Sequence, residues 1–182
     1  DLVSSRGLGD VYKRQENVWG DGVCNRDSES SFNPHGIDLV KRDDGKYQLA
    51  VVNHLPSETI EMFELLKTDI ESSNEEIVPI WELVWRGCLS VPEEYYLNDV
   101  SLAPDGSLFT THMHSKNISI LEFLFKSITK GKTGFAMRWD KEFGFSEISN
   151  SQGGQPNGIV YDNSTDILHI SLNLSDKIIS IN

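Results

Sequence analysis

Basic residues are scarce in this sequence. Its 182 residues include 16 lysines and arginines against 28 aspartates and glutamates, which gives a formal net charge of −12. A surface that binds nucleic acid or an anionic membrane needs a cluster of positive charge, and the sequence has no basic run that could form one. We therefore expect no nucleic-acid partner, whereas the negative balance suits the binding of a cation.

Long apolar runs are also lacking. No stretch is long enough to cross a bilayer, and the first residues do not follow the pattern of a signal peptide, so we predict no transmembrane segment in this chain. The sequence has only two cysteines, Cys24 and Cys88. They lack the spacing of metal ligands and need not pair, so the redox compartment stays open.

The first fifteen residues, DLVSSRGLGDVYKRQ, show no apolar periodicity and match nothing later in the chain. They look like translated adaptor sequence fused to a gene fragment. We therefore exclude residues 1–15 from the fold prediction and assign residues 16–182 to the domain. On this interpretation the natural N-terminus is missing, and the localisation of the protein is left undetermined.

The most informative feature is an internal repeat. Each repeat opens with a polar residue, then Gly or Asp, then Ile or Val: His35-Gly36-Ile37, Asn98-Asp99-Val100 and Asn157-Gly158-Ile159. Each continues with a turn: Asp44-Gly45, Asp105-Gly106 and residues 163–166. The expected apolar strands are residues 49–52, 108–111 and 167–172, and the expected alternating strands are residues 59–65, 118–123 and 177–181.

The first residues of the three repeats, 35, 98 and 157, lie 63 and 59 residues apart. A period of this size, with an Asp-Gly hairpin signal in two of the units, indicates four-stranded blades repeated around an axis. Fourth strands are expected in the linkers, at 80–88 and 134–140, and EFLFKSITKG (122–131) predicts a short helix. A β-sandwich with regular hairpins is the competing fold, and the internal repeat favours the propeller.

The repeat places polar residues at one end of the predicted propeller. The first strand of each blade lines the central channel, so His35, Asn98 and Asn157 are expected to converge near the axis. The ends of the second strands, Asn53-His54 and residues 112–114, return to the same end. Turn formation explains either asparagine alone, but it explains their shared position less well.

Four motifs in this order, FNPHGI, VVNH, LNDV and PNGI, resemble the paraoxonase/arylesterase family and its SMP-30/gluconolactonase-like relatives. ETIEMFEL, WRGC and APDGSLFTTHM are also similar to bacterial members, and the resemblance covers residues 30–182. It implies a six-bladed β-propeller with two calcium ions in its tunnel, an enzyme that hydrolyses lactones and aryl esters. We therefore expect an all-β chain that supplies about three blades of that ring.

The resemblance also implies a set of calcium ligands. Asn98 and Asn157 match side-chain ligands of an exposed catalytic calcium. Asp99 and the backbone carbonyl of Ile37 match ligands of a buried structural calcium. Calcium prefers several oxygen ligands, and amide and carbonyl oxygens hold the ion without cancelling its charge.

The histidines His35 and His54 match a pair proposed as a catalytic dyad in that family, and His114 or His112 matches a further histidine by the tunnel. A calcium ion with open positions polarises a lactone carbonyl, and a base must then take a proton from water. Histidine suits this near neutral pH. His35, on a turn between Pro34 and Gly36, is the expected base, and His54 orients it or relays the proton. The alternative is that His35 only forms hydrogen bonds around the metal site.

Three repeats make half of a six-bladed ring, and the resemblance requires further calcium ligands upstream and downstream. Glu16 and Asp21 lie too close to His35 for the upstream role. We therefore expect this fragment alone to bind calcium weakly and to hydrolyse little. The alternative function is a non-catalytic or strictosidine-synthase-like propeller that serves as a binding module with structural calcium.

Four further residues receive structural predictions. His169 alternates within a strand and is expected to be a packed or edge residue. The tryptophans are expected to pack in the core or between blades: Trp81, Trp85 and Trp139.

Overall fold

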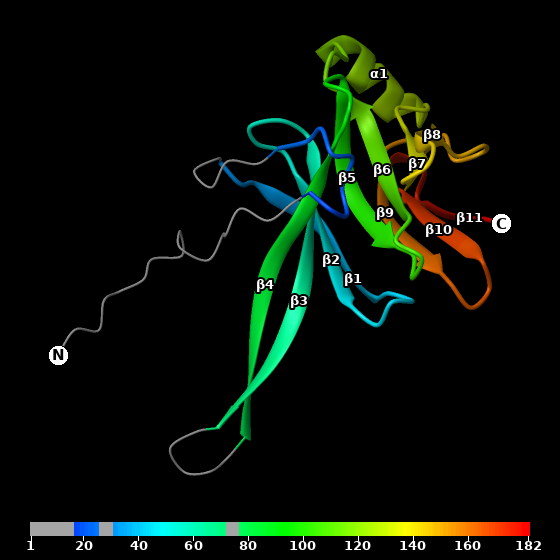
Figure 1. Ribbon diagram of the computed structural model, residues 1–182. Helices are drawn as coiled ribbons and strands as arrows, with labels where there is room; N and C mark the ends of the chain where they lie inside the picture. The colour runs from blue at the N-terminus through cyan, green and yellow to red at the C-terminus, as the bar shows by residue number, and fades with distance from the viewer. Residues whose placement is uncertain (1–16, 26–30, 72–76) are drawn as a thin grey trace.

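The computed structural model describes residues 17–25, 31–71 and 77–182, so the predictions for residues 1–15 and for Glu16 lie outside the described residues. These residues form three antiparallel sheets that lie side by side (Figure 1). The all-β prediction is confirmed. In the part of the chain that the structure describes, no helix has the length and apolar character needed to span a membrane.

The first repeat forms a four-stranded sheet in the order β1-β2-β3-β4. Its strands are β1 (Pro34–Lys41), β2 (Tyr47–Asn53), β3 (Thr59–Glu71) and β4 (Ile77–Ser90). The predicted Asp-Gly turn connects β1 and β2, and Gly45 has a φ of 85°, a conformation that glycine adopts without steric cost. The predicted fourth strand at 80–88 is confirmed as part of β4.

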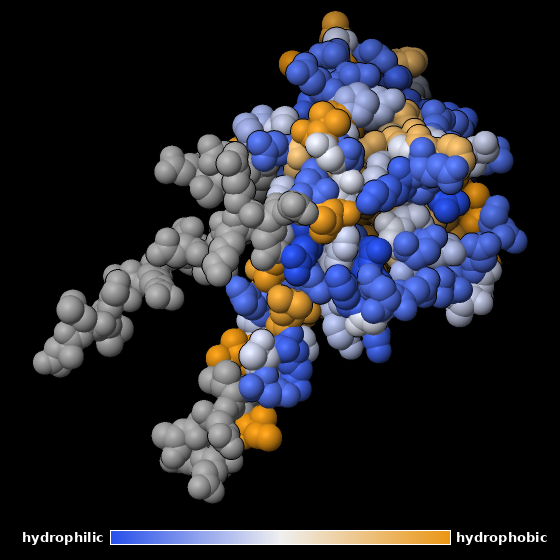
Figure 2. Space-filling view, viewed as in Figure 1, coloured by the Kyte–Doolittle hydropathy of each residue, from blue (hydrophilic) through white to orange (hydrophobic). Residues whose placement is uncertain are grey.

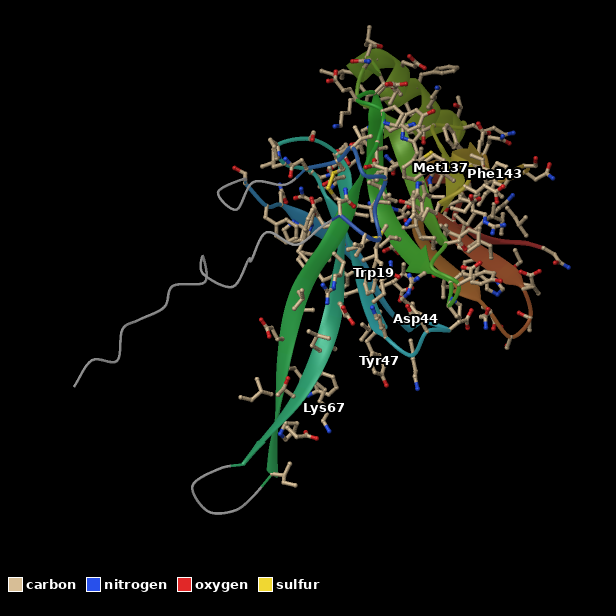
Figure 3. All side chains as sticks on the ribbon, in the orientation of Figure 1. Trp19, Asp44, Tyr47, Lys67, Met137 and Phe143 are labelled. Atoms are coloured by element: carbon tan, nitrogen blue, oxygen red, sulfur yellow. A yellow bond between two sulfur atoms is a disulfide. The ribbon has the colours of Figure 1, made fainter. Side chains whose placement is uncertain are left out.

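Strands β3 and β4 continue well beyond the other strands as a two-stranded ribbon. Their pairing runs from Thr59 and Ser90 to Glu71 and Ile77, and the ribbon projects away from the sheets, with Lys67 pointing outward from it (Figures 1 and 3). Trp81 lies on this ribbon and is 51% exposed. The prediction that Trp81 packs in the core is therefore wrong, because none of the described sheets covers this part of β4.

The second repeat forms a sheet in the order β5-β6-β7-β8, and the prediction of a four-stranded unit is confirmed here too. The strands are β5 (Tyr95–Leu102), β6 (Leu108–Ser115), β7 (Phe135–Asp140) and β8 (Gly144–Glu147). Two details of the prediction are wrong. Residues 118–123 form no strand, and residues 134–140 supply the third strand of the sheet, not the fourth.

A helix replaces the expected third strand. The helix α1 (Ile120–Thr129) confirms the short helix predicted at 122–131. The Ser119 side chain accepts a hydrogen bond from the Glu122 N–H as the N-cap, and Lys130 ends the helix in the left-handed conformation. Five apolar side chains of this helix are exposed, whereas the face of the helix region seen in Figure 2 is mostly hydrophilic: Ile120, Leu121, Leu124, Phe125 and Ile128.

The third repeat forms three strands in the order β11-β10-β9. They are β9 (Pro156–Asp162), β10 (Ile167–Leu172) and β11 (Lys177–Ile181), and a 3₁₀ turn at Asn173–Ser175 precedes β11. The predicted strands at 167–172 and 177–181 are confirmed.

The hydrophobic core lies between the sheets. One cluster joins the first and second sheets and includes Val52, Ile60, Leu89, Leu108 and Trp139, so the core prediction for Trp139 is confirmed. A second cluster, with Ala136, Ile159, Leu168, Ile170 and Leu172, joins the second and third sheets. Burial of these side chains holds neighbouring sheets face to face.

The segment that precedes β1 runs along the outer edge of β4. Backbone N–H groups of Val18 and Trp19 donate to the Arg86 carbonyl, and Cys24 forms a disulfide with Cys88. The sequence analysis left this pairing open, and the structure shows it across a separation of 64 residues. The disulfide sulfurs appear in yellow near the base of the ribbon (Figure 3).

Candidate functional site

The first strands of the three sheets lie next to one another. Strand β5 contacts β1 on one side and β9 on the other. A Cβ atom on Gly36 would lie 2.5 Å from Asp99 Cα, and the Ile159 N–H donates to Asp99 Oδ2 at 3.0 Å. The structure therefore brings the three opening motifs of the repeats together, as the sequence predicted.

The two predicted histidines touch. His35 is exposed at the start of β1, and His54 directly follows β2 with its side chain 12% exposed. Their nitrogens His35 Nδ1 and His54 Nε2 are 3.0 Å apart. Strand pairing contributes to the contact, because Pro34 pairs with Asn53 and the histidines that follow them lie diagonally across the strand pair, where the register shifts between Pro34 and Ile37. Only one ring nitrogen of His35 is engaged in this contact.

A buried carboxylate lies behind His54. Glu58, in the connection between β2 and β3, is 3% exposed, and its two oxygens lie 2.9 and 3.0 Å from His54 Nδ1. Lys116 Nζ lies 3.0 Å from Glu58 Oε1, and the Leu97 N–H donates to Oε2 at 3.3 Å. Glu58 therefore links the first sheet to the second as well as contacting His54.

Aromatic rings stack beside this pair. The rings of His54 and Tyr96 are almost parallel with centroids 4.6 Å apart, and Tyr96 stacks on His114 at 5.1 Å. His114 Nδ1 lies 3.1 Å from the Ser115 carbonyl oxygen. Of the two histidines left open by the sequence, His114 therefore lies in the same ring stack as His54.

His112 has a different environment. It is 4% exposed, and its Nδ1 accepts the Tyr96 N–H at 3.2 Å. Burial lowers the pKa of His112 from 6.5 to about 4, because the charged imidazolium loses its hydration. His112 is therefore neutral near pH 7 and holds the strand pairing of β5 and β6 in place.

The amide residues predicted as calcium ligands lie in these motifs. Asn98 is 6% exposed in β5, and Asn157 is half-buried in β9. Among the described residues, neither side-chain amide has a hydrogen-bond partner, although the Asn157 carbonyl accepts from Thr111 Oγ1 at 2.6 Å. An amide held in a buried strand without a protein partner fits an oxygen donor for a cation.

Asp99 is only partly available as a ligand. Its oxygens accept the N–H groups of Val100 and Ile159, both at 3.0 Å. Burial is the largest influence on this carboxyl and raises its pKa, and the nearby Asp38 acts in the same direction. A cation near Asp99 would relieve this penalty. Ile37, predicted to offer its carbonyl, is 61% exposed on β1 beside Asp99's strand.

Carboxylates and imidazoles alone do not form a metal site in the described part of the chain. No group of three or more His, Cys, Asp or Glu side chains there could hold an ion. A calcium ion bound near Asp99 would depend on amide and backbone carbonyl oxygens, which is the donor set that the motifs supply.

A cavity of about 240 Å³ lies away from the histidines, near the hairpin turns at the other end of the strands. Asp43, Asp105, Arg138 and Tyr161 are among the residues that line it. None of the predicted site residues lies there, so the candidate site and this cavity are separate features.

The sequence motifs did not indicate that Glu58, Lys116 and Tyr96 belong to the site. Glu58 is four residues after His54, but a lone acidic residue in a loop carries no signal of burial, and Lys116 and Tyr96 belong to another repeat. His169 lies in β10, half-buried, with Nδ1 2.8 Å from Ser180 Oγ, as expected for a residue within a strand. Searches of family models and of curated proteins give no match to this chain.

Proposed function

We propose that this chain carries part of the active site of a calcium-dependent hydrolase that acts on lactones or aryl esters. The observation that supports it most is the 3.0 Å contact between His35 and His54. The adjacent Gly36 lies against the backbone of Asn98 and Asp99. The two histidines are 19 residues apart, and the proposed ligand motifs come from separate repeats, so their proximity in the fold supports the proposal.

Each residue has a stated part in this proposal. Asn98 and Asn157 would offer side-chain oxygens to the catalytic ion, while Asp99 and the Ile37 carbonyl would offer oxygens to a separate structural ion. A calcium ion bound there would polarise the substrate carbonyl and stabilise negative charge on its oxygen.

His35 is the base in the proposed reaction. Its Nε2 takes a proton from water, the water oxygen bonds to the carbonyl carbon, and the ester C–O bond breaks. The proton then passes to the departing alkoxide oxygen, so His35 returns to its neutral form. His54, hydrogen-bonded to the other nitrogen of His35, holds the ring in place.

The test measures calcium binding and hydrolysis together. Isothermal titration calorimetry with calcium is expected to show binding that Asn98→Ala and Asn157→Ala each weaken. Asn163→Ala, in the turn between β9 and β10, is the control. Phenyl acetate and a γ-lactone are the substrates for a hydrolysis assay with calcium or with EDTA.

Any EDTA-sensitive turnover is expected to fall strongly in His35→Gln and to persist in His169→Gln. The absence of calcium binding would overturn the proposal. Calcium binding that neither Asn98→Ala nor Asn157→Ala weakens would favour a propeller that serves as a binding module with structural calcium.

A further inference from the structure

We propose that Glu58 is a positioning residue that sets the direction of the hydrogen bond between His54 and His35. This inference rests on the proposed function, since it concerns the same histidine pair. It adds a residue from the connection between β2 and β3 that the motifs did not indicate.

The Glu58 carboxylate accepts hydrogen bonds through both of its oxygens. Lys116 Nζ lies 3.0 Å from Oε1, and the Leu97 N–H lies 3.3 Å from Oε2. An ammonium and a backbone N–H only donate hydrogen bonds. Both oxygens of Glu58 therefore act as acceptors.

His54 faces the same carboxylate. Its Nδ1 lies 2.9 and 3.0 Å from the same two oxygens. A nitrogen lone pair facing two accepting oxygens would be repelled, so Nδ1 carries the proton. In the neutral ring, His54 Nε2 then has the lone pair.

The lone pair on His54 Nε2 determines which nitrogen of His35 carries the proton. Its Nδ1 is 3.0 Å from His54 Nε2, which can only accept. His35 Nδ1 therefore donates, and the lone pair of neutral His35 lies on Nε2. This is the nitrogen that the proposed reaction needs as a base, and Glu58 fixes it without touching His35.

The surroundings also hold the His54 ring in one orientation. Its Nδ1 faces the Glu58 carboxylate, and the Tyr96 ring stacks face to face on His54 at 4.6 Å. Lys116 holds the same carboxylate from another side.

The alternative is that Glu58 only joins the first two sheets through Lys116 and Leu97. Loss of a structural link would lower stability but would leave the tautomers of the histidines unchanged. The tautomers therefore separate the two roles.

The experiment is long-range ¹H–¹⁵N correlation spectroscopy of the full 182-residue chain labelled with ¹⁵N-histidine. It is recorded at mildly alkaline pH, where free imidazoles are neutral. The sequence has five histidines, and spectra of His54→Gln and His35→Gln assign the two rings of interest. In the unsubstituted protein we expect the proton on Nδ1 of both His54 and His35.

Glu58→Gln is the test variant, because the amide has nearly the same shape but can present an N–H₂ donor to His54. We expect His54 to lose its single Nδ1–H form and populate the Nε2–H form, with His35 changing in parallel. Glu61→Gln is the matched control: Glu61, in β3, is 2% exposed and accepts from Trp85 Nε1 at 2.7 Å. It should leave both tautomers as they are.

An Nε2–H tautomer on His54 in the unsubstituted protein would overturn the inference, and this needs no variant to fold. Unchanged tautomers in folded Glu58→Gln would overturn it as well. The spectra need neither calcium nor substrate. The expected tautomers without any calcium binding would therefore leave the role of Glu58 standing while the hydrolase proposal fails, and calcium binding with the opposite tautomers would do the reverse.

Discussion

Gly36 and Asp99 lie so close that the space between β1 and β5 holds no side chain at position 36. A Cβ atom there would be 2.5 Å from Asp99 Cα and 2.6 Å from the Asn98 carbonyl oxygen, which are backbone atoms that cannot move aside alone. The glycine of the first motif is therefore required by the neighbouring repeat, and the contact brings His35 next to the predicted ligands.

Gly36→Ala is expected to lower the free energy of unfolding by about 2 kcal/mol, because the added methyl group forces β1 and β5 apart. Urea unfolding followed by circular dichroism measures it. Gly158→Ala is the matched control from the third repeat, where the nearest atom to a new Cβ is Ser171 Oγ at 3.2 Å. An equal loss in both variants would show that the contact with Asp99 is not the cause.

Removal of the disulfide should destabilise the protein by about 4 kcal/mol, because Cys24 and Cys88 close a long loop in the unfolded chain. The double variant Cys24→Ser and Cys88→Ser tests this by urea unfolding. Adding dithiothreitol should have a similar effect on the unsubstituted protein and none on the double variant. A reductant effect that persists in the double variant would contradict the assignment.

Stability should fall in mild acid because of His112. Burial lowers its pKa from 6.5 to about 4. Between pH 4 and pH 6.5, His112 is therefore protonated in the unfolded chain and neutral in the folded chain. The contribution is fully present above pH 6.5 and is lost as pH falls toward 4, at most about 3 kcal/mol.

Urea unfolding across this range measures the slope of stability against pH, and His112→Asn should make it shallower. The asparagine oxygen can still accept the Tyr96 N–H, so the hydrogen bond to β5 is kept. Identical slopes in the two proteins would remove His112 as the cause.

Ser119→Ala should weaken α1 locally by about 1 kcal/mol through loss of its N-cap. None of the helix residues is buried, so tertiary packing adds little to its stability. Amide hydrogen exchange should show reduced protection in Ile120–Thr129, with protection in the β-strands retained. Ser127→Ala, within the helix, should have no such effect, since alanine favours the helix interior.

Much of the fold was predictable because each repeat contains short-range sequence patterns that specify its turns and strands. Asp44-Gly45 and Asp105-Gly106 specify hairpin turns, and the apolar strands beside them are all present. The error at residues 118–123 has a local cause as well. Alternating Ile118 and Ile120 fit a strand, but the Ser119 cap and the apolar spacing that follows favour a helix, and the helix formed.

The site was predictable only where its residues belong to motifs within one repeat. The contact between His35 and His54 follows from strand pairing within one repeat. The carboxylate behind it was not predictable, because the contacts that hold Glu58 in place come from Leu97 and Lys116 in the next repeat. Likewise, the exposure of Trp81 depends on how far the ribbon of β3 and β4 extends past the sheet, and strand patterning does not fix that length.

The opening strands are joined by hydrogen bonds that all run in one direction. Asp38 Oδ2 accepts the Leu102 N–H at 2.7 Å, and one repeat later Ser101 Oγ accepts the Tyr161 N–H at 3.0 Å. Asp38 and Ser101 each follow the first motif residue by three positions. At each of these two contacts, a side-chain acceptor on the first strand of one repeat binds a backbone N–H of the next repeat. Val160, at the same position in the third repeat, is aliphatic and offers no side-chain acceptor.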